Sequence, residues 1–330
     1  MAVQPLVSVV TPVYNGAEYL AQCIESVLAQ KYQKWYYTIV NNCSTDGTAE
    51  IACRYASKDP RIRVHHNREF LPIVANHNEA LRQSSLDSKY CKLVFADDWL
   101  FPECLERMVA LGEAHPSVGL ISAYGLRGQE VLWAGLPYPS CVVPGHDVCR
   151  QRLLGGPYIF GTGTSHMLRA DLVRRCERFY NESNLHCDSE ACFQILQVSD
   201  FGFIHQILHY TRAPRAESYT MLSHRLRTLE AMTLYELLNY GPIYLTASEF
   251  RSRMRDKLEE YYVTLAESAL DGGAPWDFHR TKLSEFGLTL DRWHFARALL
   301  RAMLAHPRHT AGQLLCRTRV FSSRFWRNTR

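Results

Sequence analysis

Over residues 5–122 the chain alternates between short, continuous apolar runs and segments whose apolar residues recur at helical spacing. The apolar runs, which we interpret as buried strands, are 7–10, 36–40, 62–64, 93–96 and 118–122. The helical patterns between them cover 20–28, 48–57, 76–84 and 102–114. Strands that alternate with helices at this spacing predict an α/β fold, with a mostly parallel sheet and helices on both of its faces.

Three of these strands stop at a cluster of polar residues. The clusters are residues 11–15 (Thr-Pro-Val-Tyr-Asn), the pair Asn41-Asn42 and the pair Asp97-Asp98. In an open α/β sheet, ligands bind beyond the carboxyl ends of the strands. Since all three clusters fall at such ends, the sequence predicts one ligand site at that edge of the sheet.

The two adjacent carboxylates of Asp97 and Asp98 follow an apolar strand. Two such charges are costly to place together without a cation, and carboxylates prefer a hard divalent ion such as Mg²⁺ or Mn²⁺. That ion would stabilise charge that develops on a leaving diphosphate. The structural alternative is a solvated turn, or a helix cap ahead of Pro102.

Four segments, in this order and at this spacing, closely resemble the motifs of glycosyltransferase family 2. They are VSVVTPVYNG (7–16), STDGT (44–48), NHNEAL (76–81) and FADDW (95–99). The resemblance extends over about residues 5–212, and the motifs are specific as a set although each is weak alone. It implies a GT-A fold, with a Rossmann-like sheet flanked by helices and a helical C-terminal region.

The resemblance also implies roles for individual residues. Thr11, Pro12 and Tyr14 would lie against the base and ribose of a nucleoside-diphosphate sugar, where an aromatic ring can stack on a base. Asp97 would contact the ribose or the metal, and Asp98 would be the main metal ligand at the diphosphate.

Three residues depart from the family pattern. His77 stands where the family often has arginine near the sugar or diphosphate, and a neutral histidine supplies less charge than arginine. Asn41 and Asn42 replace a pair of aspartates, the second of which commonly recognises the base. Asparagine carries both a donor and an acceptor, so Asn42 can still read a base edge, but uracil is no longer implied.

An inverting transferase needs a carboxylate that accepts the proton of the acceptor hydroxyl. The family places this residue as an aspartate ahead of a helix rich in large apolar residues, which fits Asp188, with Glu190 as the alternative. Both residues also suit the first turn of a helix without any catalysis. The small residues of 161–166 (Gly-Thr-Gly-Thr-Ser-His) lie where related enzymes build the acceptor side, and a plain loop is the alternative.

The pattern changes to helices after residue 215, so we expect a catalytic domain in 1–215 and a helical region in 216–330. The net charge of the chain is only +4, but residues 293–330 hold eight arginines and no acidic residue. Leucines, phenylalanines and a tryptophan interleave with these arginines, which is typical of contact with an anionic membrane surface or a partner. A helix packed on the domain is the alternative. No recognised module supports binding to nucleic acid.

Neither a secretory signal nor a run of about 18 apolar residues is present, and the odd number of cysteines, eleven, favours reduced thiols. We therefore expect a cytoplasmic protein that can lie on the inner membrane face. Residues His186, Cys187 and Cys192 are not spaced as a zinc site.

Together these features predict an inverting glycosyltransferase with a divalent cation. It would move a sugar to a hydroxyl of a surface polysaccharide, lipopolysaccharide or lipid-linked glycan. A nucleotidyltransferase is less well supported, because residues 11–16 do not form a Gly-rich, basic phosphate loop. The alternative outside enzymes is a degenerate GT-A domain that binds a nucleotide or a partner, for which Asn41-Asn42 is the best support.

Overall fold

The computed structural model describes residues 4–213 and 219–305. The chain divides into two compact units, Met1–Ala213 and Pro214–Arg330. Each unit has a hydrophobic core of its own, as expected of parts that are built as separate domains.

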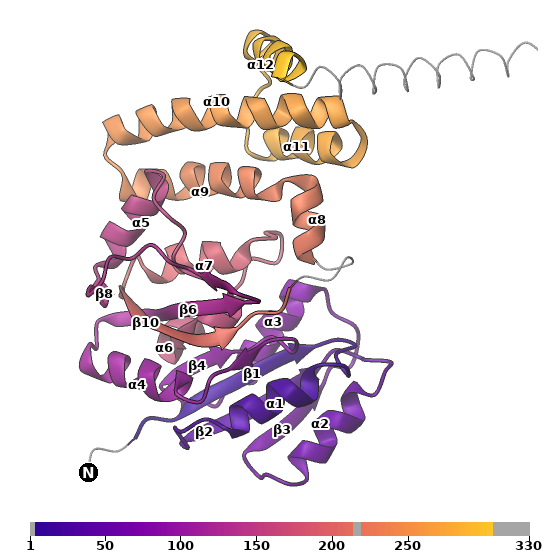
Figure 1. The fold of residues 1–330 in the computed structure, drawn as a ribbon, viewed down its shortest axis with the longest axis vertical. Coiled ribbons are helices and arrows are strands. Elements are labelled where there is room, and N and C mark those ends of the chain that lie inside the picture. The colour runs from indigo at the N-terminus through magenta and orange to yellow at the C-terminus, as the bar shows by residue number, and fades with distance from the viewer. Residues whose placement is uncertain (1–3, 214–218, 306–330) are drawn as a thin grey trace, which may run out of the picture. The chain divides into compact units, whose positions relative to one another are not determined.

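The first unit alternates strands and helices along the chain (Figure 1). Its strands are β1 (Val7–Val13), β2 (Trp35–Asn41), β3 (Ile62–His66), β4 (Tyr90–Leu93), β5 (Trp99–Leu100), β6 (Val118–Arg127), β7 (Glu130–Leu132), β8 (Val142–Val143), β9 (Met167–Arg169) and β10 (Asp200–Tyr210). Its helices are α1 (Leu20–Leu28), α2 (Thr48–Ala56), α3 (Ile73–Arg82), α4 (Cys104–Ala114), α5 (Gly145–Leu153), α6 (Ala170–Arg174) and α7 (Cys187–Ile195), with a 3₁₀ turn, η1, at Gly163–Ser165.

All ten strands form one sheet, in the order β3-β2-β1-β4-β9-β6-β10-β5, with β7 and β8 paired off this path. The first four strands are parallel, and beyond them β9 runs antiparallel to both β4 and β6. The α/β fold is therefore confirmed, and the sheet is parallel where the polar clusters lie and mixed beyond β4. The sequence did not predict β5, β7, β8 or β9, because a strand of two or three residues is too short to show a period.

Helices cover both faces of the sheet. On one face α1 buries Leu20, Cys23, Ile24 and Val27 in the same core as α4. On the other face the end of α3 is tied to the sheet, since Thr38 donates a hydrogen bond to the carbonyl of Gln83. Strand β1 is buried along its whole length, which explains its continuous apolar run.

Residues 161–166 pack inside the first unit instead of forming an open loop, and all but Thr162 are buried. A Cβ on Gly163 would lie 2.6 Å from Cδ2 of Leu93 and 2.8 Å from Cζ of Phe95. The small residues of this segment therefore let η1 approach β4 and the turn that follows it, which are parts of the protein itself.

The second unit consists of helices over its described residues, 219–305. They are α8 (Tyr219–Leu226), α9 (Thr228–Tyr244), α10 (Ala247–Asp271), α11 (Gly273–Glu285) and α12 (Arg292–Ala305). Helix α10 begins at a capping box formed by Thr246 and Glu249. Helices α8 and α9 are separated by Arg227, which has a φ of 55° and forms ion pairs with Glu267 and Asp271 of α10.

We expect Gly163→Ala to lower the free energy of unfolding by about 1–3 kcal/mol, because the added methyl group overpacks the contact between η1 and β4. Urea denaturation of the two proteins measures this. The matched control is Gly47→Ala, where the nearest atom to a new Cβ is 3.9 Å away and φ is −72°. An equal effect of the two substitutions would contradict the packing role assigned to Gly163.

Candidate functional site

Polar and aromatic residues collect at the carboxyl ends of four adjacent strands, β3, β2, β1 and β4 (Figure 1). The loops that follow these strands are 67–72, 42–47, 14–19 and 94–98. Because the strands are parallel neighbours, the loops lie along one edge of the sheet in that order. The three clusters singled out in the sequence therefore meet at this edge.

Of Thr11, Pro12 and Tyr14, only Tyr14 presents its side chain to solvent. Tyr14 is 49% exposed, and its ring lies edge to face against Phe70, with centroids 4.9 Å apart. Thr11 is fully buried and its hydroxyl lies 2.8 Å from the hydroxyl of Tyr37. Pro12 is buried as well. Thr11 and Pro12 can thus shape the edge through their backbone, but the Thr11 hydroxyl is directed into the core.

The carboxamide of Asn42 is bonded to the loop that follows β3. Its Nδ2 donates to the carbonyl of Leu71 at 2.8 Å, and its Oδ1 accepts from the backbone N–H of Leu71 at 2.9 Å and from Nδ2 of Asn67 at 2.8 Å. Asn41 makes a separate contact, from its Nδ2 to Nδ1 of His66 at 3.1 Å. Asn42 therefore has structural partners within the protein that the sequence did not predict.

The acidic pair has one exposed and one buried member. Asp97 is exposed, whereas Asp98 is only 3% exposed. The Asp98 carboxylate accepts a 2.6 Å hydrogen bond from the Thr164 hydroxyl and a 3.1 Å bond from the backbone N–H of Arg212. Burial, with a smaller contribution from Asp97, raises the pKa of Asp98 to about 7. A buried carboxylate with such a pKa lacks a compensating cation.

Arg212, which the sequence analysis missed, supports the acidic pair from the end of β10. Its Nε donates to the carbonyl of Asp97 at 3.1 Å, and its NH2 group donates to Oε1 of Gln22 at 2.8 Å. Its guanidinium lies 3.7 Å from the ring centroid of Tyr19. The available signal was its place directly after a strand, which is the same signal that identified Asp97 and Asp98.

His77 lies between the acidic pair and the α7 region. Its ring centroid is 5.1 Å from that of Phe95 and 6.2 Å from that of Tyr180. Burial lowers the pKa of His77 to about 4. The imidazole is therefore neutral at physiological pH, and it cannot supply the positive charge that an arginine would bring to a diphosphate.

Asp188 and Glu190 are both in the first turn of α7 but have different surroundings. One oxygen of Asp188 accepts a 2.9 Å bond from the N–H of Ser189, and burial of the carboxyl group raises its pKa to about 6. Glu190 accepts hydrogen bonds from the carboxamides of Asn181 and Asn184, at 3.1 Å and 2.7 Å. Glu190 thus holds the 181–184 turn, whereas Asp188 has the raised pKa that suits a general base.

A chain of buried polar contacts joins Asp98 to the backbone of Asp188. The Lys92 ammonium donates to the carbonyls of Thr164 and His166, and the Thr164 hydroxyl donates to Asp98. His166 lies 3.7 Å from Sγ of Cys192, which donates to the carbonyl of Asp188. Burial lowers the pKa of His166 to about 3, so its imidazole is neutral, and burial also lowers the pKa of Lys92.

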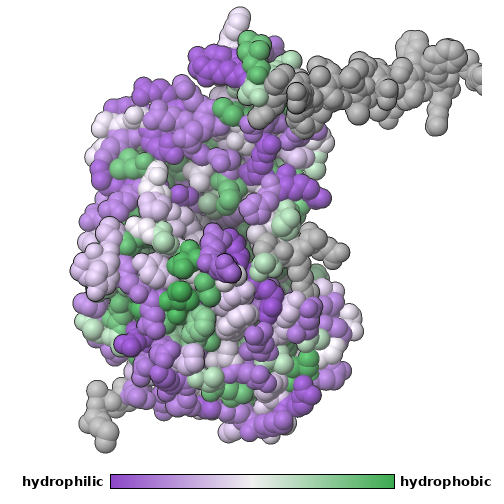
Figure 2. Space-filling view, viewed as in Figure 1, coloured by the Kyte–Doolittle hydropathy of each residue, from purple (hydrophilic) through white to green (hydrophobic). Residues whose placement is uncertain are grey.

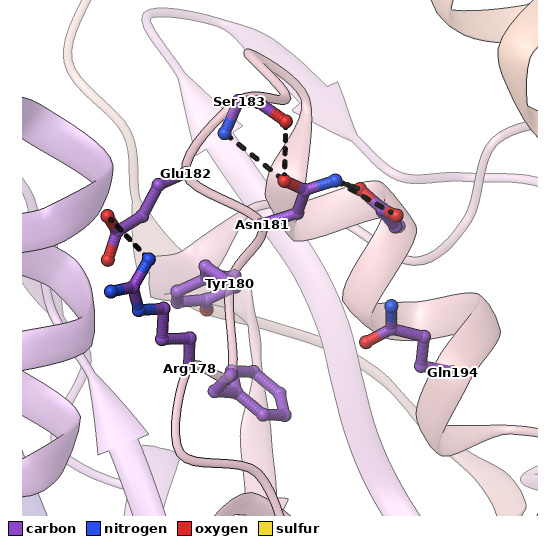
Figure 3. Close-up of a pocket in the computed structure, with 8 residues that line it drawn as sticks. Arg178, Tyr180, Asn181, Glu182, Ser183 and Gln194 are labelled. Carbon is purple, nitrogen blue, oxygen red and sulfur yellow. Dashed lines mark hydrogen bonds and ion pairs between the residues drawn. The ribbon is translucent and has the colours of Figure 1, made fainter.

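A separate cavity of about 420 Å³ lies beside α7 (Figure 3). It is lined by residues 178–183, Glu190 and Gln194. Figure 3 shows the hydrogen bonds of Asn181 and the ion pair of Arg178 with Glu182 at its border. Glu190 and Gln194 are four residues apart and share a face of α7, while Asp188 is two residues from Glu190 and lies on a different face.

The family model for glycosyl transferase family 2 matches residues 8–176, just over half of the chain. The chain belongs to this family. The match ends before Asp188, so it includes the residues of the strand ends but not those of α7.

Two relatives are about one third identical to the chain over the residues that align. EpsE of Bacillus subtilis (strain 168), named as a glycosyltransferase, is 32% identical over 158 residues, which are 46% of this chain and 56% of EpsE. TuaG of the same strain, named as a teichuronic acid biosynthesis glycosyltransferase, is 32% identical over 127 residues, 38% of this chain and 50% of TuaG. The chain therefore spans about half the length of these curated relatives.

Solved structures share the fold at low sequence identity. TarS of S. aureus, in complex with UDP-GlcNAc, has a TM-score of 0.62 and 17% identity, with 92% of this chain and 87% of that chain covered. The mannosyltransferase PcManGT of Pyrobaculum calidifontis, in complex with GDP-Man and Mn²⁺, has a TM-score of 0.56 and 18% identity, with 95% and 88% covered. The fold class expected from the sequence is thereby confirmed.

The residues present fit a divalent metal that is shared with a phosphate ligand. No group of three or more His, Cys, Asp or Glu side chains that could hold a metal occurs within 4–213 and 219–305, and this includes the surroundings of His186. Mg²⁺ is usually bound through one or two carboxylates together with substrate phosphates. The adjacent carboxylates of Asp97 and Asp98 would suit such a site, and burial together with the neighbouring carboxylate raises the pKa of Asp98 to about 7.

Asp98→Asn is expected to stabilise the metal-free protein at alkaline pH only. The folded-state pKa of Asp98, about 7, lies above the value near 3.9 of an aspartate in an unfolded chain. The free energy of unfolding of the wild type therefore falls as the pH rises between these values, and the loss is complete above pH 7. We expect the variant to be more stable by about 4 kcal/mol at pH 8, and by no more than about 1 kcal/mol at pH 4.5.

Chemical denaturation at the two pH values in the presence of a chelator measures this difference. The matched control is Asp87→Asn, which changes an exposed aspartate of the same unit. A stability difference between Asp98→Asn and wild type that is the same at both pH values would show that ionisation of Asp98 is not its cause.

Proposed function

We propose that the protein is an inverting glycosyltransferase that moves a sugar from a nucleoside-diphosphate sugar to a hydroxyl acceptor. The observation that carries this proposal is the placement of two kinds of carboxylate around His77. Phe95, which contacts His77, belongs to the turn of Asp97 and Asp98, and Tyr180, which also contacts it, lies within the electrostatic reach of Asp188. The turn of the acidic pair and the surroundings of Asp188 are thus connected through His77, which supports a shared role for these carboxylates.

In this proposal the donor lies along the edge of the parallel strands. Its base is at Tyr14, with the backbone of Thr11 and Pro12 and the residue Asn42 in the wall behind it. Its ribose is near Asp97, and its sugar is near His77. Mg²⁺ or Mn²⁺, held by Asp98 and Asp97, would supply Lewis-acid stabilisation of the diphosphate. The complexes of TarS with UDP-GlcNAc and of PcManGT with GDP-Man and Mn²⁺ support this choice of donor and ion.

Asp188 acts as the general base. As the acceptor oxygen attacks the anomeric carbon, its proton passes to the Asp188 carboxylate. The bond from the anomeric carbon to the diphosphate oxygen breaks on the opposite face, and the electron pair of that bond leaves with the diphosphate. A single displacement of this kind inverts the configuration without a covalent intermediate. The pKa of Asp188, about 6, leaves it largely ionised at neutral pH and still basic enough to accept the proton.

The acceptor that we propose is a hydroxyl of a surface polysaccharide, lipopolysaccharide or lipid-linked glycan. Its support is the teichuronic acid biosynthesis role in the name of TuaG. The second candidate, a degenerate domain that only binds a nucleotide or partner, has its support in the engaged carboxamide of Asn42. Release of a nucleoside diphosphate from any sugar nucleotide, dependent on Mn²⁺ and abolished by a chelator, would exclude it.

We expect Asp188→Asn to lower kcat by about 10²–10⁴-fold while the dissociation constant of the donor stays within about twofold, because a general base acts on the acceptor proton. Steady-state kinetics and calorimetry measure the two quantities. In the wild type kcat/KM should rise with pH through about 6, as Asp188 loses its proton.

Glu190→Gln is the matched control, since it changes the other carboxylate of the same helical turn and keeps an oxygen that can accept from Asn184. We expect it to retain most of kcat. The reverse pattern, with kcat lost in Glu190→Gln and kept in Asp188→Asn, would make Glu190 the base.

We also propose that the second unit contacts an anionic membrane through α12. Trp293, Leu300 and Leu304 are exposed on this helix, and Arg297 and Arg301 are exposed beside them. Figure 2 shows hydrophobic and hydrophilic surface side by side on α12. No helix within the described residues has the length and apolarity to cross a bilayer. The six arginines after Arg301 lie outside the described residues.

Charge reversal of Arg297 and Arg301 to Glu should weaken binding to vesicles of equal parts phosphatidylglycerol and phosphatidylcholine by about 30-fold, since each basic residue near such a surface contributes about 1 kcal/mol. Sedimentation with vesicles measures this. Arg54→Glu with Lys58→Glu reverses two exposed charges, one on α2 and one just after it, and serves as the control. Wild-type protein that does not sediment with the vesicles would overturn the membrane proposal.

A further inference from the structure

Two exposed aromatic rings, from the loops after β1 and β3, meet at the edge of the sheet. Tyr14, after β1, is 49% exposed, and Phe70, after β3, is 57% exposed. Their ring planes make an angle of 68° with centroids 4.9 Å apart, so the two rings form a corner. A flat aromatic ligand that stacks on one ring of such a corner also touches the other ring.

The loop that carries Phe70 is held by a network of asparagines. Leu71, the next residue, exchanges two hydrogen bonds with the Asn42 carboxamide, as one residue of a β-ladder does with its partner. Nδ2 of Asn67 donates to Oδ1 of Asn42 at 2.8 Å and lies 2.9 Å from Oδ1 of Asn76. The backbone N–H of Asn67 donates to the carbonyl of Asn41 at 3.0 Å.

This network explains why residue 42 is an asparagine here. The bond from Nδ2 to the Leu71 carbonyl needs a donor, and the bond from the Leu71 N–H needs an acceptor. An asparagine provides both, whereas an aspartate only accepts and would place its charge against the carbonyl oxygen of Leu71. Asn42 is 2% exposed, so its polar atoms depend on these protein partners.

We propose that Phe70 and Tyr14 together form the stacking surface for the base of the donor nucleotide, and that Asn42 is a positioning residue that holds Phe70 in this corner. The inference rests on the proposed function. It assigns Phe70 a role in binding the base. It also assigns Asn42 the role of supporting the loop of Phe70, in place of the direct contact with the base that the family resemblance implies.

The order of the strands agrees with this assignment. Along the edge the loops of β3 and β1 carry the aromatic corner, and the loop of β4, the next strand after β1, carries Asp97 and Asp98. A nucleoside diphosphate has its base at one end and its phosphates at the other, so the corner and the acidic pair suit its two ends.

Stacking recognises the face of a base, which every base presents, and hydrogen bonds to a base edge are what distinguish one base from another. Because the carboxamide of Asn42 is bonded to Leu71 and Asn67, the corner selects weakly between bases. The dissociation constants of UDP, GDP, dTDP and CDP in the presence of Mn²⁺ should therefore lie within about tenfold of one another, since they share the stacking contact.

The test is a double-mutant cycle on nucleotide affinity. Titration calorimetry with Mn²⁺ measures the dissociation constants of UDP and GDP for wild type, Phe70→Ala, Asn42→Asp and the double variant. Inorganic pyrophosphate is the ligand that lacks a base. Tyr36→Ala, which removes another half-exposed ring in the same unit, is the control substitution. The melting temperature of each variant without ligand shows that it is folded.

We expect Phe70→Ala to weaken both nucleotides by about tenfold, which is the usual effect of losing one stacking ring. Pyrophosphate should be unaffected, and Tyr36→Ala should bind like wild type. Asn42→Asp should weaken the nucleotides in wild type but not in the Phe70→Ala background, since Asn42 acts through Phe70. If the losses of nucleotide affinity in the two single variants add up in the double variant, or if Asn42→Asp weakens the binding of only one of the two nucleotides, Asn42 contacts the base directly. Either result would overturn its positioning role.

Equal nucleotide affinity of Phe70→Ala and wild type would overturn the role of Phe70 and leave the proposed function intact. If wild-type protein binds none of the nucleotides with Mn²⁺, the proposed function fails first and this inference fails with it. A loss of pyrophosphate binding in Phe70→Ala would show that the substitution disturbs the whole edge, which would also overturn a specific stacking role.

Discussion

The hydrogen bond from Thr164 to Asp98 connects the two halves of the first unit. Thr164 belongs to η1, within the buried segment 161–166, and Asp98 follows β4, the last strand of the parallel half. The ammonium of Lys92, fully buried in β4, holds the same turn through the carbonyls of Thr164 and His166. A lysine is almost never buried in this way unless its charge has partners. Removal of these contacts would free both the turn and the carboxylate.

This arrangement keeps one carboxylate in an environment that opposes its charge. Asp98 has a raised pKa because it is buried and lies beside Asp97, while Thr164 and Arg212 stabilise its ionised form only in part. The free protein is thus less stable above neutral pH than a neutral side chain would make it, and a divalent cation would remove this cost. Ligand sites commonly lower the stability of the free protein in this way, because they keep a charged group that binding needs and that destabilises the fold.

The periodicity of the sequence was sufficient to predict the strands and helices that build the parallel half of the sheet. It placed β1, β2, α1 and α4 within a few residues, because each is long enough to show a period. It placed the strand before the acidic pair at 93–96, whereas β4 ends at Leu93, since Lys92 looks like a surface residue in sequence and lies in the core. Because ligands bind beyond the carboxyl ends of the strands in an open α/β sheet, the sequence also predicted that Tyr14, Asn42 and the acidic pair lie at one edge.

The sequence could not predict contacts between loops that are far apart along the chain. Asn42 and Leu71 are 29 residues apart, and Arg212 reaches Gln22 across 190 residues. Nothing in the local pattern separates Phe70 from any other exposed aromatic residue. His77 is buried by packing against Phe95 and Tyr180, and this burial lowers its pKa and leaves it uncharged. No local feature of the sequence indicates that His77 is buried.

In the function proposed here, a nucleoside diphosphate and a divalent cation bind together at the edge formed by β1 and β4. Titration calorimetry of a nucleoside diphosphate into wild-type protein, with Mn²⁺ and again with a chelator, tests this. We expect binding that is strong with Mn²⁺ and at least tenfold weaker without it, because the ion would be shared between the diphosphate and the carboxylates of Asp97 and Asp98. Binding that is unchanged by the chelator, or no binding in either condition, would contradict it.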